Sequence, residues 1–204
     1  GALLHDVGKL MVPKEILKKP GRLSHEEFEM MKMHTRYGFD LLRNLHSISL
    51  LVAHCAFQHH ERIDGSGYPG GLVDFEIHPF AKIIGVADVF DAVTTNRVYR
   101  EKMLPSQGLA IVEAGSGTIY DARIVNALKR SVVHYPNGLI LKLSDGRRGI
   151  VSKQNTLDAA LPWIRIFEEC NELLTATYEI NLVDYPTVKI DSIETDYVVP
   201  TRVV

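Results

Sequence analysis

Through the first two thirds of the chain, apolar residues recur every three or four positions, which is the period of an amphipathic helix. The first apolar stripe consists of Leu3, Leu4, Val7, Leu10 and Met11. Pro13 ends this pattern, and Asp6 falls on its apolar side. The spacing therefore predicts a short helix that carries an inward acidic group.

Two further helices are predicted to carry histidine on their inward faces. Ser24 and Glu27 have the spacing of a capping box, which marks the start of the first of them. Its inward stripe consists of Met31, His34, Gly38 and Leu41. The other helix spans about 47–60, and its stripe consists of Ile48, Val52, Cys55 and His59. In each helix a histidine continues an apolar stripe and is expected to point into the core.

A long loop separates these helices from the next one. The segment from Glu61 to Pro79 contains four glycines and has no helical period, and loops of this length in compact domains are usually functional or mobile. The helix after Pro79 presents apolar and acidic residues on neighbouring turns: Phe80, Ile84, Ala87, Asp88 and Asp91. Two amphipathic helices follow at about 105–115 and 121–133.

Beyond Pro136 the helical period gives way to short β-rich runs separated by turn residues. Strands are predicted at 139–143, 149–151, 163–167, 178–182 and 188–190, with a hairpin turn at Asp145 and Gly146. The predicted fold class is therefore mainly α. A helical bundle over 1–135 is followed by a small, barrel-like β module over 136–204.

Composition and charge exclude several classes of protein. The chain has 204 residues, 46% of them hydrophobic and 24% charged, so it is neither disordered nor collagen-like. A net charge of −2 gives no basic surface for duplex nucleic acid or an anionic membrane, but it is compatible with a local basic pocket for a phosphorylated ligand. Two cysteines and no apolar run of membrane-spanning length predict a cytoplasmic protein without membrane contact from this segment.

Histidine and aspartate gather on or beside the inward stripes of the predicted helices. They are His5, Asp6, His34, His59, His60 and Asp88. One inward histidine is more often a hydrogen-bonded core residue than a ligand, but six such groups buried together would be costly without a cation. Imidazoles and carboxylates bind Zn, Mn, Fe or Ni, and six donors exceed what one tetrahedral ion needs. Two metals are therefore expected.

Two such ions about 3.5–4 Å apart can share a bridging hydroxide and stabilise both oxygens of an in-line phosphoryl displacement. Asp6 could bridge the ions, because a carboxylate has two oxygens. Lys9 follows His5 by one helical turn, where its ammonium could neutralise a phosphate oxygen or assist the leaving group. An isolated lysine at this position would more often be solvated.

Four strings, in their order and spacing, resemble the HD-GYP family of bacterial cyclic-di-GMP phosphodiesterases. They are HDVGK at 5–9, PKEILKKPGRLSHEEFEMMKMH ending at His34, HHERIDGSGYP at 59–69 and DVFDAVTTNRVYR at 88–100. The resemblance covers roughly 1–133 and implies an HD-type helical core with two, in some members three, divalent ions, commonly iron or manganese. It implies hydrolysis of cyclic di-GMP to linear pGpG or onward to GMP. The metal ligands carried over by position are His5, Asp6, His34, His59, His60 and Asp88.

The resemblance also implies contacts with the substrate. Lys9 matches a lysine near the scissile phosphate, and Arg97 and Arg100 match basic positions that contact phosphates or bases. Tyr68 of the GYP string is on the loop that borders the substrate cleft in such proteins. The plainer interpretations are that the arginines are solvated and that Tyr68 packs beneath a turn shaped by its neighbours.

The start of the sequence departs from the family pattern. A further histidine from an upstream helix, and in three-metal members a glutamate, are absent, since the chain starts four residues before His5. We expect an N-terminally truncated protein in which one ion lacks a ligand. The alternative function is therefore a truncated or degenerate module that binds cyclic di-GMP, or a protein partner through the GYP loop from Asp64 to Gly71, without turnover. A phosphohydrolase of monomeric nucleotides shares the metal chemistry but does not account for HHERIDGSGYP, and the sequence leaves a homodimer open.

Overall fold

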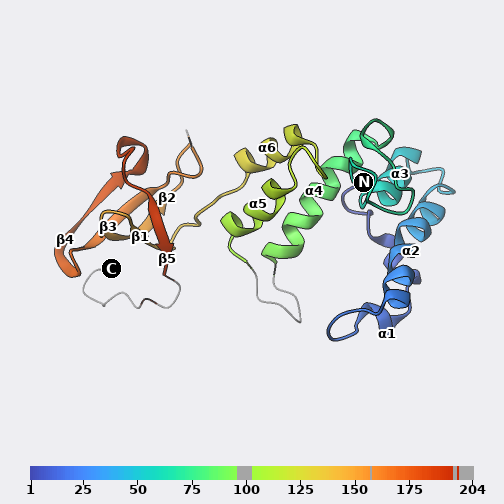
Figure 1. Ribbon diagram of the computed structural model, residues 1–204, viewed down its shortest axis with the longest axis horizontal. Helices are drawn as coiled ribbons and strands as arrows, with labels where there is room; N and C mark the ends of the chain where they lie inside the picture. Colours follow the sequence, from blue (N-terminus) through green and yellow to red (C-terminus); the bar gives the residue numbers. More distant parts are fainter. Residues whose placement is uncertain (96–102, 157, 195–196, 198–204) are drawn as a thin grey trace. The chain divides into compact units, whose positions relative to one another are not determined.

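The computed structural model describes residues 1–95, 103–156, 158–194 and 197 (Figure 1). The chain forms two compact units, Gly1–Lys129 and Arg130–Val204. The first unit is helical and the second carries a five-stranded sheet, so the mainly-α prediction is confirmed only in part. Within the described ranges, each helix is too short or too polar to cross a membrane.

Six α-helices and two short 3-10 helices precede the sheet in the described part of the chain. They are η1 (Val7–Met11), α1 (Lys14–Leu17), α2 (His25–Leu42), α3 (Leu50–Gln58), η2 (Asp74–Glu76), α4 (Pro79–Thr94), α5 (Pro105–Ala114) and α6 (Ala122–Ser131). The predicted capping box begins α2, because the Ser24 side chain accepts the Glu27 N–H and the Glu27 carboxylate accepts the Ser24 N–H. The side chain of Ser49 caps α3 in a similar way.

The segment before α1 differs from the helix predicted there. It consists of turns followed by η1, and Leu3 and Leu10 are 99% and 81% exposed. A 3-10 helix has about three residues per turn, so apolar residues spaced for an α-helix do not share one of its faces. Leu4 and Val7 pack against the core cluster of the first two long helices, which consists of Leu42, Ala53 and Ala56.

The inward faces of α2 and α4 also differ from the predicted stripes. On α2, Leu42 is buried and Leu41 is exposed, the reverse of the prediction. On α4, Phe80, Ala87 and Asp91 are exposed, although the spacing placed them on one inward face. This helix packs against both α3 and α5, so its buried residues lie on two sides and a single stripe does not describe it.

The second unit is an antiparallel sheet with the strand order β4-β3-β2-β1-β5. Its strands are β1 (Ile140–Leu143), β2 (Arg148–Lys153), β3 (Trp163–Glu169), β4 (Glu172–Asn181) and β5 (Ile190–Ile193). Its core consists of Leu141, Leu143, Val151, Ile164, Ile166, Ile180 and Leu182. The described residues show no hydrogen-bonded ladder between β4 and β5, so the predicted barrel-like closure is not seen among them.

Two tight turns connect the strands of this sheet. The predicted turn at Asp145 and Gly146 joins β1 to β2, and Gly146 has a φ of +88°, a left-handed conformation that favours glycine. Cys170 and Asn171 join β3 to β4 with φ angles of 49° and 64°. This second turn lacks glycine, so the sequence pattern missed the first half of β4.

Asp121 caps α6, and its loss is expected to destabilise the helical unit. Its Oδ1 accepts the backbone N–H of Arg123 at 2.8 Å, and its Oδ2 pairs with the Arg123 guanidinium at 2.8 Å. Asp121→Ala should lower the free energy of unfolding by about 1 kcal/mol, because the N–H loses its acceptor. The hydrogen bond from Arg123 lowers the pKa of Asp121 to about 2. The ionised Asp121 carboxylate therefore stabilises the folded state through Arg123 above about pH 4, and this contribution is lost as the pH falls toward 2.

Urea unfolding is followed by circular dichroism at 222 nm and repeated at several pH values. It measures both the loss of stability in Asp121→Ala and the pH dependence of the stability. Asp121→Asn is the matched control, because an asparagine side chain can still accept the Arg123 N–H. An Asp121→Ala protein as stable as the wild type at pH 7 would show that water replaces the cap.

Candidate metal centre

Four segments of the first unit bring the six candidate ligands together. His5 and Asp6 precede η1, His34 lies in α2, His59 and His60 follow α3, and Asp88 lies in α4. Close approach of backbones sets these positions. A Cβ on Gly8 would lie 1.9 Å from the His34 carbonyl oxygen, and one on Gly85 would lie 2.4 Å from the His59 carbonyl oxygen. Glycine at these two places therefore lets η1 and α4 approach the histidines.

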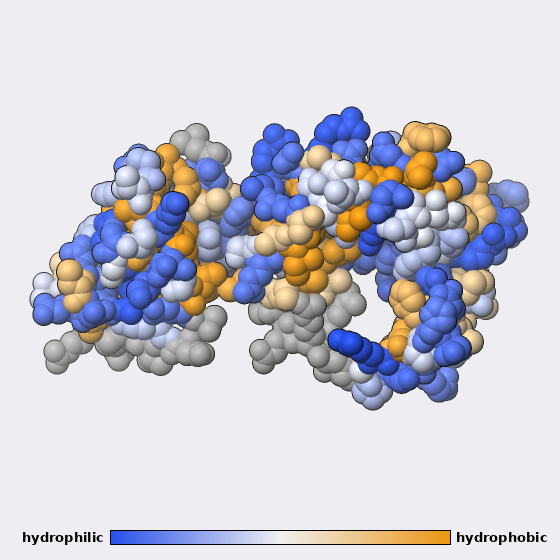
Figure 2. Space-filling model, in the orientation of Figure 1, coloured by the Kyte–Doolittle hydropathy of each residue, from blue (hydrophilic) through white to orange (hydrophobic). Residues whose placement is uncertain are grey.

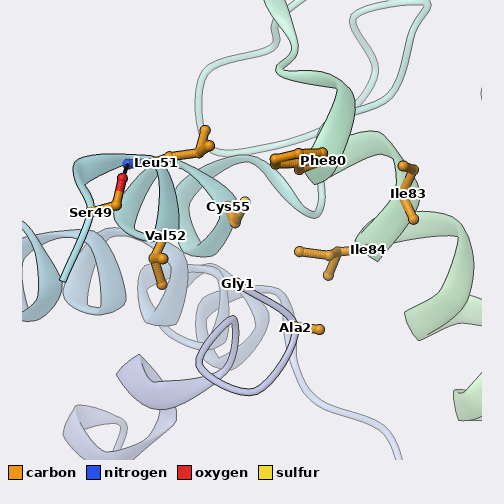
Figure 3. A pocket seen from close by; sticks show the side chains of 9 residues that line it. All are labelled: Gly1, Ala2, Ser49, Leu51, Val52, Cys55, Phe80, Ile83 and Ile84. Atoms are coloured by element: carbon orange, nitrogen blue, oxygen red, sulfur yellow. Dashed lines mark hydrogen bonds between the residues drawn. The ribbon is translucent and has the colours of Figure 1, made fainter.

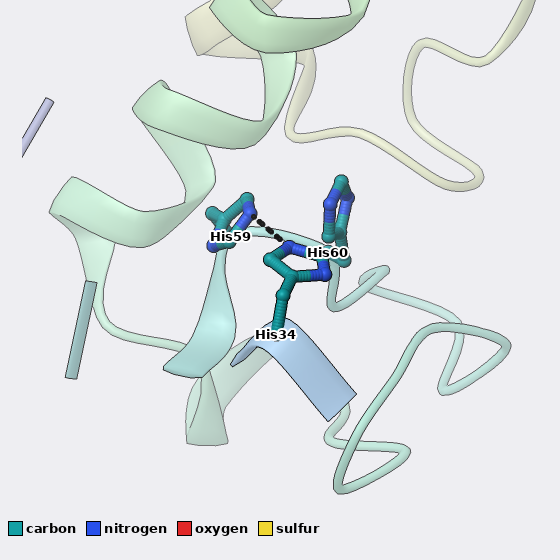
Figure 4. Close-up of side chains that lie close together, drawn as sticks. All are labelled: His34, His59 and His60. Carbon is teal, nitrogen blue, oxygen red and sulfur yellow. Dashed lines mark hydrogen bonds between the residues drawn. The ribbon is translucent and has the colours of Figure 1, made fainter. Parts of the chain in front are cut away.

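One group of donors consists of His34, His59 and His60 (Figure 4). Their candidate ligand atoms lie within 4.8 Å of one another, and the Nε2 atoms of His34 and His59 are 3.3 Å apart. The Nδ1 of His34 donates to the Met31 carbonyl at 2.7 Å, and that of His59 donates to the Ala56 carbonyl at 2.9 Å. These bonds fix the tautomer of both rings and leave each Nε2 as an acceptor or ligand atom.

A second group consists of His5, Asp6 and His59, again with ligand atoms within 4.8 Å of one another. Asp6 faces both groups with different oxygens. Its Oδ2 is 3.4 Å from the His5 Nε2, whereas its Oδ1 is 3.4 Å from the His34 Nε2 and 3.8 Å from the His59 Nε2. Asp88 Oδ1 lies 3.7 Å from the His5 Nε2. One carboxylate thus links the imidazoles of both groups.

Protonation states in the cluster follow from burial and charge. Burial lowers the pKa of His34, His59 and His60, and that of His59 falls to about 4. These three rings are therefore neutral near pH 7, which is the form that binds metal. Asp6 and then Asp88 raise the pKa of His5 to about 10. Burial alone would raise the pKa of Asp6, but His5 and Lys9 hold it below its usual value.

Two buried atoms in this cluster make no hydrogen bond to the described residues. They are Nε2 of His5 and Oδ1 of Asp6. An unsatisfied buried polar atom costs about 1–3 kcal/mol, so these atoms are suited to bind a ligand. Imidazole nitrogens and carboxylate oxygens fit Mn, Fe or Zn, with the His5 ring proton released when a metal binds, and one tetrahedral ion would leave two of the six donors over. The residues present therefore fit divalent transition metals.

The residues predicted to contact the substrate differ in where they lie relative to the cluster of candidate ligands. Lys9 Nζ is 2.5 Å from Asp6 Oδ2, so the ammonium lies at the cluster. The Tyr68 ring stacks on His60 with centroids 4.7 Å apart, and burial raises the pKa of its phenol, which stays protonated. Arg97 and Arg100 lie outside the described residues, and their substrate contacts stay predictions.

Glu61 is a residue of this site that the sequence analysis did not single out. It is 6% exposed, and its carboxylate oxygens accept the backbone N–H groups of Gly70 and Leu72 at 2.6 and 2.9 Å. The Tyr68 N–H donates to the His60 carbonyl at 3.2 Å. The loop that carries Tyr68 is thus tied to the end of α3. The sequence feature that could have identified Glu61 is an acidic residue at the start of a glycine-rich loop, where backbone N–H groups need acceptors.

Removing the Glu61 carboxylate is expected to destabilise the helical unit. Charge-assisted hydrogen bonds contribute about 1.5–3 kcal/mol each, partly offset by the cost of burying the carboxylate, so Glu61→Ala should lose about 2 kcal/mol. Glu61→Gln keeps one acceptor and should lose about half as much. Urea unfolding followed by circular dichroism at 222 nm compares the two variants. Equal losses in both would show that the charge, rather than the number of acceptors, holds the loop.

An apolar pocket of about 290 Å³ lies elsewhere in the helical unit (Figure 3). It is lined by Gly1, Ala2, Ser49, Leu51, Val52, Cys55, Phe80, Ile83 and Ile84. This lining includes none of the six candidate ligands and has few polar atoms. Hydrophobic residues are also exposed between hydrophilic ones on the visible face of the helical unit (Figure 2).

Comparisons with known proteins identify the family to which the chain belongs. A family model described as "HD domain" matches residues 1–124. Cyclic di-GMP phosphodiesterase PA4108 of Pseudomonas aeruginosa is 36% identical over 165 residues, which cover 81% of this chain and 40% of that protein. The 3'3'-cGAMP-specific phosphodiesterase 3 of Vibrio cholerae is 40% identical over 136 residues, 67% of this chain and 29% of that protein. The chain thus spans less than half the length of either relative.

A solved structure shows the same fold. The HDG"Y"P protein Bd1817 from Bdellovibrio bacteriovorus matches with a TM-score of 0.50 and 21% identity, over 62% of this chain and 40% of that one. The 165-residue match to PA4108 is longer than the helical unit, which ends at Lys129, so that similarity continues into the second unit.

Proposed function

Since this chain belongs to the HD-domain family, and its resemblance to HD-GYP proteins is confirmed, we propose that it is a metal-dependent phosphodiesterase that hydrolyses cyclic di-GMP. The position of Asp6 carries the proposal. Its Oδ2 faces His5, and its Oδ1 faces His34 and His59, at 3.4 to 3.8 Å, so Asp6 would be placed to contribute to both ions. The neutral state of His34, His59 and His60 supports the same assignment.

The proposed ligands divide between the two groups of donors. His34, His59 and His60 would hold one ion, His5 and Asp88 would hold the other, and Asp6 would contribute to both. Iron or manganese suits this mixture of imidazole and carboxylate, and Zn or Ni also binds such donors. When bound, the ions supply positive charge that polarises the phosphate and lowers the pKa of a water.

The chain's own residues position and neutralise the substrate. Lys9 Nζ lies 2.5 Å from Asp6 Oδ2, so this side chain can pair with a phosphate oxygen that enters the cluster. The Tyr68 ring stacks on one face of His60. Hydrolysis adds one water across a phosphodiester bond and releases linear pGpG, and a second hydrolysis yields GMP.

Incubation of the 204-residue protein with Mn²⁺ or Fe²⁺ and cyclic di-GMP tests the proposal. Metal analysis should give about two ions per chain, and chromatography should detect pGpG or GMP. Bound metal and bound cyclic di-GMP without turnover would favour a binding module. Faster turnover of 3'3'-cGAMP would identify that dinucleotide, instead of cyclic di-GMP, as the preferred substrate. A protein that binds neither metal nor cyclic dinucleotide would refute the proposal.

Metal binding is also expected to stabilise the helical unit. An ion that binds the folded state alone adds about 2.7 kcal/mol at one hundred times its Kd. Thermal unfolding followed at 222 nm should therefore shift upward with Mn²⁺ and return with a chelator. Trp163, the one tryptophan of the chain, lies in β3 and reports the second unit by its fluorescence. A metal-induced shift seen only in the Trp163 fluorescence would show that the metal binds the second unit, contrary to the proposal.

A further inference from the structure

A second cavity, of about 430 Å³, lies within the five-stranded unit. Its wall is formed by the connection between β4 and β5, which includes the short 3-10 helix η3 (Leu182–Asp184), together with the segments before β1 and before β3. Small-molecule sites have volumes of about 300–1,000 Å³, and an apolar cavity of about 150 Å³ is enough for benzene. This cavity is therefore large enough for a ligand with two fused rings.

Side-chain amides hold the three wall segments together. Asn155 is buried, and its Nδ2 donates to the Leu161 carbonyl at 3.1 Å and to the Oδ1 of Asn181, which caps η3, at 2.8 Å. The Nε2 of Gln154 donates to the Tyr135 carbonyl at 2.9 Å. The cavity is thus formed in the folded protein itself, so a ligand does not have to order its wall.

The lining combines aliphatic side chains with two tyrosine rings. Leu182 belongs to the core of the sheet, and Leu161 packs against that core. The Tyr185 ring lies 5.1 Å from the Arg147 guanidinium, a cation–π contact that helps to fix it. Burial raises the pKa of Tyr135, so its phenol stays protonated near pH 7 and can donate a hydrogen bond. These groups suit a ligand with an aromatic body.

Lys189 adds a positive charge to this apolar lining. Among the described residues it is the one charged group that lines the cavity, and it forms no ion pair with any of them. Its backbone is fixed beside the turn between β1 and β2, because its N–H donates to Ser144 Oγ at 3.0 Å and its carbonyl accepts the Ser144 N–H at 2.8 Å. An anion that enters the cavity therefore meets an unpaired cation and, within the described lining, no acidic group.

We propose that this cavity binds a small aromatic carboxylate, whose ring lies against Tyr135 and Tyr185 and whose carboxylate pairs with Lys189. The apolar lining supplies affinity for the ring, and the ammonium selects the anion over a neutral compound of the same shape. The proposal does not depend on the phosphodiesterase function, because the cavity lies in Arg130–Val204, whereas the candidate metal centre lies in Gly1–Lys129.

Isothermal titration calorimetry of the 204-residue protein with 2-naphthoate tests the proposal, with 2-naphthamide as the neutral analogue of similar shape. The wild type should bind 2-naphthoate about 5-fold more tightly than the amide, because an ion pair forms with the anion alone. Lys189→Met keeps most of the side-chain length and should abolish this preference. The matched control is Lys142→Met, which removes the charge of a β1 lysine outside the described lining and should keep the wild-type preference.

A second variant tests whether binding takes place in the cavity. Ala160 lines it, so Ala160→Phe should fill part of its volume and weaken the binding of both compounds about 10-fold or more. Circular dichroism and the Trp163 fluorescence spectrum check that the fold is retained, and Lys189→Met decides alone if they change. Absence of binding at millimolar 2-naphthoate, equal affinities for the acid and the amide in the wild type, or a preference that survives in Lys189→Met would overturn the proposal.

Discussion

The proposed metal binding and the proposed hydrolysis of cyclic di-GMP are both expected to be lost in the Asp6→Ala protein. The Asp6 carboxylate faces His5 with one oxygen and His34 and His59 with the other, at 3.4 to 3.8 Å. Its removal takes a donor and a negative charge from both proposed ion sites. Metal ions supply several kcal/mol of transition-state stabilisation, so kcat should fall by about a thousandfold or more. Metal analysis and chromatography of the linear product measure the two losses.

Two variants separate this effect from general damage. Asp6→Asn preserves the shape and one oxygen but removes the charge, so metal affinity and turnover should fall while the circular dichroism spectrum stays unchanged. His46→Ala removes an exposed imidazole from the connection between α2 and α3, outside both donor groups, and should keep metal and turnover. Full metal content in Asp6→Ala would show that the carboxylate does not link two ions, and equal losses in His46→Ala would indicate nonspecific unfolding.

The convergence of the candidate ligands was accessible from the sequence in part, because His34 and Asp88 lie in regular helices and His59 directly follows one. His34 and His59 continue apolar stripes on α2 and α3, and both are 1% exposed in the structure. The capping box at Ser24 fixes where α2 begins and hence which face carries His34. Local hydrogen bonding and helical periodicity are short-range properties, so a single sequence contains them.

The features that the sequence missed depend on contacts between distant segments. Leu10 has the spacing of a core residue but is 81% exposed, because η1 approaches α2 through Gly8 and adopts a tighter helix. The carboxylate of Glu61 finds its partners nine and eleven residues later. Phe28 meets Tyr68 only after the GYP loop folds back toward α2. Such pairs have no periodic signal, since tertiary packing alone brings them together.

Gly8→Ala is expected to separate the His5 and Asp6 pair from His34 and to unfold the helical unit more easily. A Cβ at Gly8 would lie 1.9 Å from the His34 carbonyl oxygen and 2.4 Å from the Gly38 nitrogen. Both atoms belong to the backbone of α2, which cannot yield as a flexible side chain does. The segment before α1 must therefore move away from α2, and the expected loss is about 3 kcal/mol, together with most of the bound metal.

Gly38→Ala is the matched control, because it adds the same methylene-sized group from the opposite side of this contact. Its Cβ would lie 3.3 Å from the Ala56 Cβ and 3.4 Å from the Gly8 nitrogen, so small shifts relieve the crowding. The higher helix propensity of alanine offsets the remaining cost, and stability should change by less than about 1 kcal/mol. Urea unfolding at 222 nm reports the helical unit, while Trp163 fluorescence reports the sheet. Gly8→Ala should shift the first transition and leave the second in place; an equal shift of both, or full metal binding in Gly8→Ala, would mean that this backbone contact does not position His5 and Asp6.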